Sequence, residues 1–349
     1  MQIVYNLPKK VILLRFLFET IMIMRVLSKY IINKNLSINK QKNNGAVKRI
    51  TFVATIRHLT YNGGNGHENK NIGGQFMNLF SPAQIAENYV SIGKSKVNTA
   101  IPKMFLLAVM AGVFIALGGV GATTAAVGVQ PAAIGKLLGA CIFPGGLTMV
   151  LLAGSELFTG NCLLTVPLLS GEVTLPGVLR NWIVVYLGNF AGGLLVAAGA
   201  VYSHQLSLFG NGMAVSVIST AAGKCTMSFS DALIRGVFCN FLVCIAVWIS
   251  FAAKDAAGKV IGLFFPIMIF VLCGFEHSVA NMYYIGAGLM AKTVPEYLDA
   301  ALAAGLNPDV INLGNFLFAN LLPVTIGNIL GGGVCVGGVY WLTYLRKAD

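Results

Sequence analysis

Hydrophobic residues gather in six long segments that follow residue 76 of the chain. Each segment is near or above the roughly 20 apolar residues that a helix needs to cross the hydrocarbon core of a membrane. Their approximate limits are 103–128, 137–169, 178–203, 231–253, 259–291 and 311–345. Lipid offers no hydrogen-bond partner to free backbone groups, so these segments are predicted to be helical. The pattern therefore predicts an all-α membrane protein with six transmembrane helices.

The last three segments repeat the polar pattern of the first three. Segments two and five share the motif Gly-x-Glu-x-x-x-x-Asn, and segments three and six share a second spacing of Asn and Gly. Because each half has an odd number of spans, the two halves must have opposite orientations, which defines an inverted 3+3 repeat. The matched positions are Gly154, Glu156, Asn161, Asn181 and Asn189 in the first half, and Gly274, Glu276, Asn281, Asn320 and Asn328 in the second.

Both Gly-x-Glu motifs lie in the middle of long apolar segments, where polar residues are incompatible with exposure to lipid. We therefore predict that the second and fifth helices are broken there. Two symmetric breaks at bilayer depth are typical of a solute site, and the amides and half-helix dipoles at a break attract anions. We interpret Glu156 and Glu276 as structural groups that accept hydrogen bonds from the amides of their own break, with a proton relay as the alternative.

Three stretches, 157–161, 274–282 and 320–328, are similar to the signature motifs of the formate/nitrite transporter family. The resemblance covers nearly all of residues 77–349. It implies an aquaporin-like protomer with broken second and fifth helices, a homopentamer with one pore per protomer, and no cofactor. It also implies a function in passing small monovalent anions, such as formate, nitrite and hydrosulfide, across the cell membrane.

The resemblance also implies roles for individual residues. Its central pore histidine corresponds to His277, the one histidine inside a predicted span, and its break-loop residues to Leu157 and Thr159. The further positions are Asn328 facing that histidine, Phe143, Leu147 and Phe270 at a constriction, Lys224 at a vestibule and Asn240 on the fourth span. The repeated motif itself makes Asn161 and Asn281 structural residues at the breaks. Each role has a structural alternative. His277 could be a hydrogen-bonded core residue, Phe143 and Phe270 could lie in the core or face lipid, and Lys224 could be a solvated residue of the longest outward loop.

Composition agrees with membrane residence, because 56% of residues are apolar, 10% are charged and the mean hydropathy is +0.76. Residues 1–76 carry 12 Lys and Arg against two acids, so most of the net charge of +12 lies there and indicates no nucleic-acid partner. We interpret 1–76 as a basic, disordered extension or as a mis-annotated start upstream of Met77, and we favour the latter. Residues 77–349 form the predicted channel domain.

Basic residues near the spans set the expected orientation of the chain in the membrane. One side has Lys94, Lys96, Lys103, Arg180, Lys254, Lys259, Arg346 and Lys347, and the other has Lys136, Lys224, Arg235 and Lys292. The larger group predicts that both termini are cytoplasmic.

Other functional classes fit the sequence less well than an anion channel does. An intramembrane enzyme would need a nucleophile with a base, or several metal ligands, within the spans, so no catalytic or metal site is predicted. The seven cysteines include no Cys-x-x-Cys pair and are interpreted as small buried hydrophobes. A neutral-solute channel of aquaporin-like architecture stays open as an alternative, as do formate-specific and hydrosulfide-specific channels.

Overall fold

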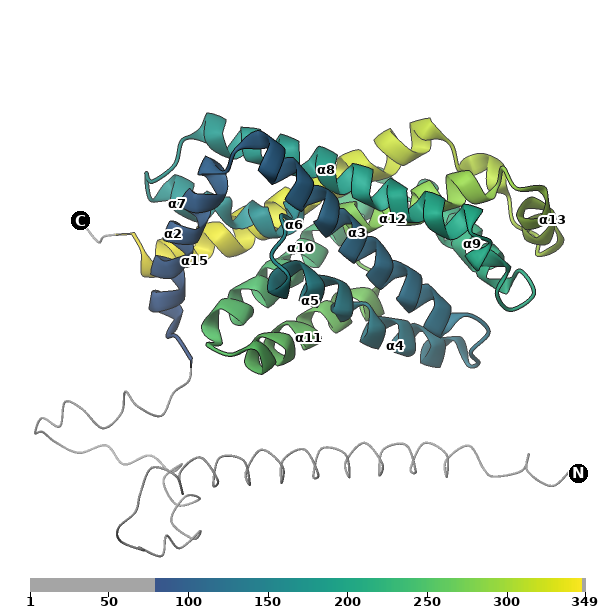
Figure 1. Ribbon diagram of the computed structural model, residues 1–349, viewed down its shortest axis with the longest axis horizontal. Coiled ribbons are helices and arrows are strands. Elements are labelled where there is room, and N and C mark those ends of the chain that lie inside the picture. Colours follow the sequence, from purple (N-terminus) through teal and green to yellow (C-terminus); the bar gives the residue numbers. More distant parts are fainter. Residues whose placement is uncertain (1–78, 347–349) are drawn as a thin grey trace, which may run out of the picture. The chain divides into compact units, whose positions relative to one another are not determined.

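The structure, a computed structural model, describes residues 79–346 (Figure 1). The predictions about residues 1–76 and about a start at Met77 lie outside the described residues. Within the described part, six helices or helix pairs are long and apolar enough to cross a membrane. They are Ile101–Ala126, Ala132–Leu152, Leu175–Tyr202, Phe229–Ala252, Ala256–Cys273 and Asn315–Tyr344. The prediction of six membrane-spanning segments is therefore confirmed.

The first half of the described chain starts with an amphipathic helix and continues through three spans. Its helices are α2 (Pro82–Asn98), α3 (Ile101–Ala126), α4 (Ala132–Ile142), α5 (Pro144–Leu152), α6 (Phe158–Asn161), η2 (Cys162–Leu164), α7 (Thr165–Leu169) and α8 (Leu175–Tyr202). Helix α2 begins at Ser81 because the Ser81 hydroxyl and the Gln84 side chain bond reciprocally to each other's backbone amides. Pro144 separates α4 from α5 within one span.

The second half continues through three further spans. Its helices are η3 (Gln205–Ser207), α9 (Gly212–Cys225), α10 (Phe229–Ala252), α11 (Ala256–Cys273), α12 (Ser278–Ala291), α13 (Pro295–Ala303), η4 (Pro308–Val310), η5 (Asn315–Leu321), α14 (Leu322–Asn328), η6 (Ile329–Gly338) and α15 (Val339–Tyr344). Elements η5 to α15 form one continuous span that includes two π-helical stretches.

Helix α9 differs from what the sequence analysis expected. The sequence predicts a loop around Lys224, whereas the structure places this residue in the last turn of α9. Helix α9 precedes α10 as α2 precedes α3, so each half of the repeat comprises an amphipathic helix and three spans. The helix was missed because its Gly, Ala and Ser residues give only a weak apolar periodicity.

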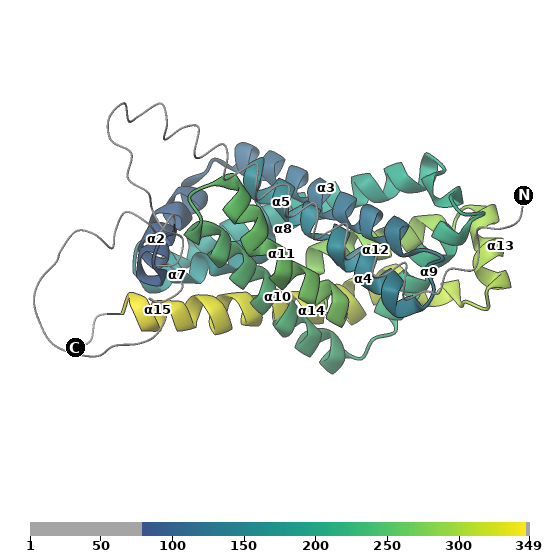
Figure 2. The ribbon, with the colours of Figure 1, turned by 90° about the horizontal axis from the view of Figure 1, so that it is seen from below.

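Small residues let the spans approach closely within each half. Helix α3 packs along α8, and α10 packs along α14 and η6 (Figures 1 and 2). A Cβ atom at Gly192 would collide with the carbonyl oxygen of Val109, and one at Gly331 would collide with that of Val237. These contacts are equivalent in the two halves, and they are typical of membrane helices that pack backbone against backbone.

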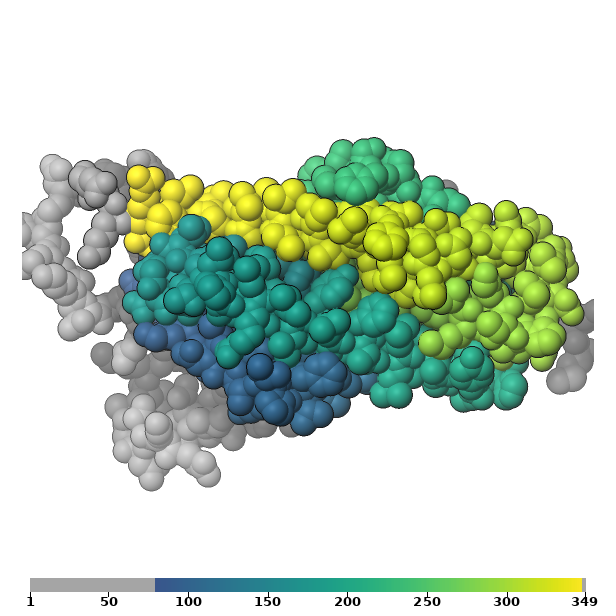
Figure 3. All heavy atoms as spheres, turned by 90° about the horizontal axis from the view of Figure 1, so that it is seen from above, coloured from purple at the N-terminus to yellow at the C-terminus, as the bar shows by residue number. Residues whose placement is uncertain are grey.

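The last span also lies beside α8 (Figure 3). The Tyr186 and Thr325 hydroxyl oxygens are 2.9 Å apart, and the Phe190 and Phe316 rings stack at 5.8 Å. Leu187, Leu317 and other apolar residues line an open groove there, and many of them are exposed in the isolated chain.

Candidate functional site

Two non-helical stretches interrupt the second and fifth spans. Helix α5 ends at Leu152 and α6 begins at Phe158, while α11 ends at Cys273 and α12 begins at Ser278. Each stretch turns at a glycine with positive φ, 78° at Gly154 and 71° at Gly274. Leu157 and His277 are the N-cap residues of the helices that follow, so they hold equivalent places in the repeat.

A buried asparagine holds each break. Asn189 Oδ1 accepts from the Phe158 amide at 2.9 Å, and its Nδ2 donates to the Ala108 and Glu156 carbonyls. These bonds satisfy groups that the break frees in the interior of the membrane. The sequence indicates Asn189 only as a position of the repeat, and its role at the break comes from the structure.

Asn328 makes the same set of bonds in the other half. Its Oδ1 accepts from the Ser278 amide at 3.0 Å, and its Nδ2 donates to the Gly236 and Glu276 carbonyls. Among the described hydrogen bonds of the Asn328 side chain, none reaches His277. Both of its N–H donors are engaged with carbonyls, so in this structure Asn328 supports the break, and its place opposite the His277 ring stays a prediction.

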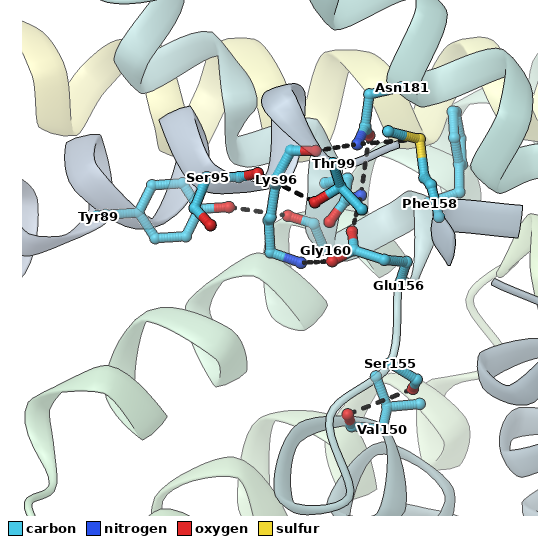
Figure 4. Close-up of polar contacts among 12 residues, drawn as sticks. Tyr89, Ser95, Lys96, Thr99, Val150, Ser155, Glu156, Phe158, Gly160 and Asn181 are labelled. Atoms are coloured by element: carbon cyan, nitrogen blue, oxygen red, sulfur yellow. Dashed lines mark hydrogen bonds and ion pairs between the residues drawn. The ribbon is translucent and has the colours of Figure 1, made fainter. Parts of the chain in front are cut away.

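The Glu156 carboxylate is held by side chains from two elements, α2 and α6 (Figure 4). Lys96 Nζ on α2 lies 2.9 Å from one carboxylate oxygen, and Asn161 Nδ2 donates to the other at 2.7 Å. Asn161 also donates to Asn181 Oδ1, and Asn181 donates to the Lys96 carbonyl. On the same α2 helix, the Tyr89 hydroxyl donates to the Gly160 carbonyl.

The Glu276 carboxylate has the matching partners in the second half. Lys224 Nζ on α9 lies 2.8 and 2.9 Å from its two oxygens, and Asn281 Nδ2 donates to it at 2.6 Å. Asn281 also donates to Asn320 Oδ1 at 2.8 Å. We expected both carboxylates to accept from the amides of their own breaks, and this was wrong. The Glu276 amide donates instead to the Arg235 carbonyl, as the Glu156 amide donates to the Leu107 carbonyl.

His277 and Thr159 meet where the two breaks approach each other. His277 Nε2 lies 3.0 Å from Thr159 Oγ1, and the Ala280 amide donates to His277 Nδ1 at 3.0 Å. Because Nδ1 accepts, the neutral ring has its proton on Nε2 and donates it to Thr159. Asn240 ties the halves together, since its Nδ2 donates to the Thr159 and Asn328 carbonyls. Its Oδ1 is buried without a partner in the described chain.

Two cavities flank this contact. The His277 cavity, about 250 Å³, touches the end of α3 and is lined by Lys136, Phe143, Lys224, Phe270, Glu276 and His277 among others. The Glu156 cavity, about 320 Å³, touches Leu107 near the start of α3 and is lined by Tyr89, Lys96, Leu147, Glu156, Leu157 and Phe251 among others. The cavities therefore approach the breaks from opposite ends of the spans.

Apolar side chains close the space between the cavities. Phe143 and Phe270 meet edge to face with ring centroids 5.5 Å apart, and Phe270 stacks on the His277 ring at 5.8 Å. Leu147 and Leu157 lie on the Glu156 side, and all four residues are at most 3% exposed. Of the predicted constriction residues, Phe143 and Phe270 therefore line the His277 cavity, and Leu147 lines the Glu156 cavity. Thr159, Asn240 and Asn328 line neither cavity.

These features define a class of protein: a six-span membrane channel with two symmetric helix breaks, each lining a cavity. Comparison with known sequences identifies the family. Residues 83–342 match the formate/nitrite transporter family, and the chain belongs to it. Like its relatives, it is a membrane channel for small anions and not an enzyme.

Individual relatives agree with this assignment. The formate channel FocA of Escherichia coli K12 is 36% identical over 275 residues, which are 78% of this chain and 96% of FocA. An uncharacterized transporter of Bacillus subtilis, YrhG, is 38% identical over 271 residues, which are 76% of this chain and 94% of YrhG. A solved structure described as a pentameric formate channel with formate bound is similar with a TM-score of 0.63 and 36% identity, covering 70% of this chain and 98% of that one.

Proposed function

We propose that this chain forms a homopentameric channel that carries formate and anions of similar size across the cytoplasmic membrane. The pore of each protomer runs from the His277 cavity, past Thr159 and His277, to the Glu156 cavity. The observation that carries this proposal is the 3.0 Å contact between Thr159 Oγ1 and His277 Nε2, because it joins the two broken spans between the two cavities. The pentameric formate channel among the solved relatives supports the assembly and the substrate.

The geometry suggests how an anion is selected. Phe143, Phe270, Leu147 and Leu157 admit only a solute that sheds most of its water. Beyond the rings, Nε2–H of His277 and the hydroxyl of Thr159 are donors for a carboxylate or nitrite oxygen. Thr159 accepts from His277 in the empty pore, so its hydroxyl hydrogen is left to donate to the solute. The N-termini of α6 and α12 add positive potential at this point.

Two pairs of residues hold the breaks in this proposal: Glu156 with Asn161, and Glu276 with Asn281. We place the His277 cavity on the outer side and the ends of the channel domain on the cytoplasmic side. The support is the excess of lysine and arginine on the side that holds Lys96, Arg180 and Lys254. Cysteine labelling from outside intact cells, with single cysteines at Lys292 and Lys259, tests it: only the former is expected to react.

Flux into proteoliposomes is the direct test of function. Purified protein is expected to carry formate, nitrite and hydrosulfide, with water and ammonia at the level of protein-free vesicles. Selective water or ammonia flux would instead favour the neutral-solute channel. Hydrosulfide flux with no formate flux would identify a hydrosulfide channel. Native mass spectrometry in detergent is expected to give five copies, and any other number contradicts the proposed assembly.

A further inference from the structure

The two cavities differ in charge. The charged residues that line the Glu156 cavity are Lys96 and Glu156, which form an ion pair at 2.9 Å and cancel. The His277 cavity is lined by two cations, Lys136 and Lys224, and by one anion, Glu276, which leaves one positive charge. A surplus cation beside the solute path raises the local concentration of anions.

The surplus charge does not reside on Lys224. Its ammonium contacts both oxygens of Glu276, and the two side chains are only 14% and 5% exposed. The Lys224 ammonium also lies 5.5 Å from the centroid of the Tyr284 ring. An anion arriving in the cavity meets the field of a neutral pair there, which falls off steeply with distance. Because Glu276 neutralises its charge, Lys224 by itself does not attract anions into the cavity.

Lys136 is the uncompensated cation. It lies on α4, is exposed, and makes no hydrogen bond or ion pair with the described residues. Its ammonium stands over the break of the fifth span, since a Cβ atom at Gly274 would lie 3.4 Å from Nζ. The equivalent glycine of the first half, Gly154, has nothing within 4 Å of the same point. The cation is therefore present at one break and absent at the other.

We propose that Lys136 concentrates anions in the His277 cavity and so sets the rate at which they enter the pore from that side. The inference rests on the proposed function. The charge is solvent-exposed, so its effect must weaken as salt shortens the Debye length from about 30 Å at 0.01 M to about 3 Å at 1 M. A structural alternative is that Lys136 only stabilises the negative end of the α11 dipole.

The experiment measures formate uptake into proteoliposomes at subsaturating formate, at about 0.01 M and about 1 M ionic strength. The variants are Lys136→Gln, Lys136→Arg and the matched control Arg235→Gln. Arg235 is also exposed and belongs to the same predicted face, but it does not line the His277 cavity. Lys136→Gln is expected to lower flux about threefold at low salt and to match the wild type at high salt. The other two variants are expected to match the wild type at both.

Three results overturn the inference. These are equal flux of Lys136→Gln and wild type at low salt, an equal loss in Arg235→Gln, or a loss that persists at high salt. The last result, together with a lower unfolding temperature, would assign Lys136 the structural role at α11. A wild-type protein that carries no small anion would overturn the proposed function itself, so the two failures are distinguishable.

Discussion

Replacing Asn328 by leucine tests whether it holds the break or belongs to the pore. The change removes the partner of two groups in the fifth-span break, the Ser278 amide and the Glu276 carbonyl. Each buried backbone group left without a hydrogen bond costs about 1–3 kcal/mol, so the expected loss is about 2–6 kcal/mol in the free energy of unfolding. The third acceptor, the Gly236 carbonyl, is inside α10, and we assign little cost to it.

The chain provides a matched comparison. Asn189→Leu removes the partner of the Phe158 amide and the Glu156 carbonyl, so it is expected to cost the same amount. Asn88→Leu, at an exposed position on α2, is expected to change stability by no more than about 0.5 kcal/mol. Unfolding of the purified variants in mixed micelles of increasing SDS content measures all three.

The outcome that refutes this reasoning is specific. If Asn328→Leu lost less than about 1 kcal/mol and changed the ratio of formate to nitrite flux, while Asn189→Leu lost about 2–6 kcal/mol, the role of Asn328 would be in the pore. A loss near zero for both variants would mean that water satisfies the freed backbone groups at the breaks.

Three further predictions concern the pore and the packing. His277→Asn is expected to alter anion selectivity or its pH dependence more than Glu156→Gln, measured as formate and nitrite flux from pH 5 to 8, and the reverse ranking would contradict the assigned roles. Phe270→Ala is expected to admit lactate, because it removes a ring that packs on both Phe143 and His277; unchanged exclusion of lactate would place the narrow point elsewhere. Gly192→Ala is expected to cost about 1–3 kcal/mol in unfolding free energy through its clash with a backbone carbonyl, while Gly199→Ala, with nothing within 4 Å, is expected to cost nothing.

The sequence alone determined much of the fold, because a membrane limits the choices. Length and hydropathy fixed six spans, and the repeated Gly-x-Glu motif located both places where helices end at Leu152 and Cys273. The sequence did not predict the short helix α9, because its many Gly, Ala and Ser residues resemble those of a loop. One signal was available in the sequence. Lys96 lies at the end of α2, before the first span, and Lys224 lies at the end of α9, before the fourth span, so the repeat includes α2 and α9.

Side-chain partners were harder to infer than positions. Glu156 and Glu276 were located correctly but given the wrong partners, because the ammonium groups that bind them come from residues 60 and 52 positions earlier in the chain. Asn328 was noticed through its spacing, yet spacing does not tell whether an amide points at a pore or at a backbone. Such choices depend on which donors are already engaged, and only coordinates reveal that.

Leu157 and His277 occupy equivalent positions of the two halves but are different residues. This difference limits how such a channel can be built. Two identical half-length chains, associated head to tail across a bilayer, would have the same residue at both places: two imidazoles facing each other, or two isobutyl groups and no proton donor between them. A single ring opposite a hydroxyl requires two halves that differ in sequence. Two identical half-length chains therefore cannot form this contact.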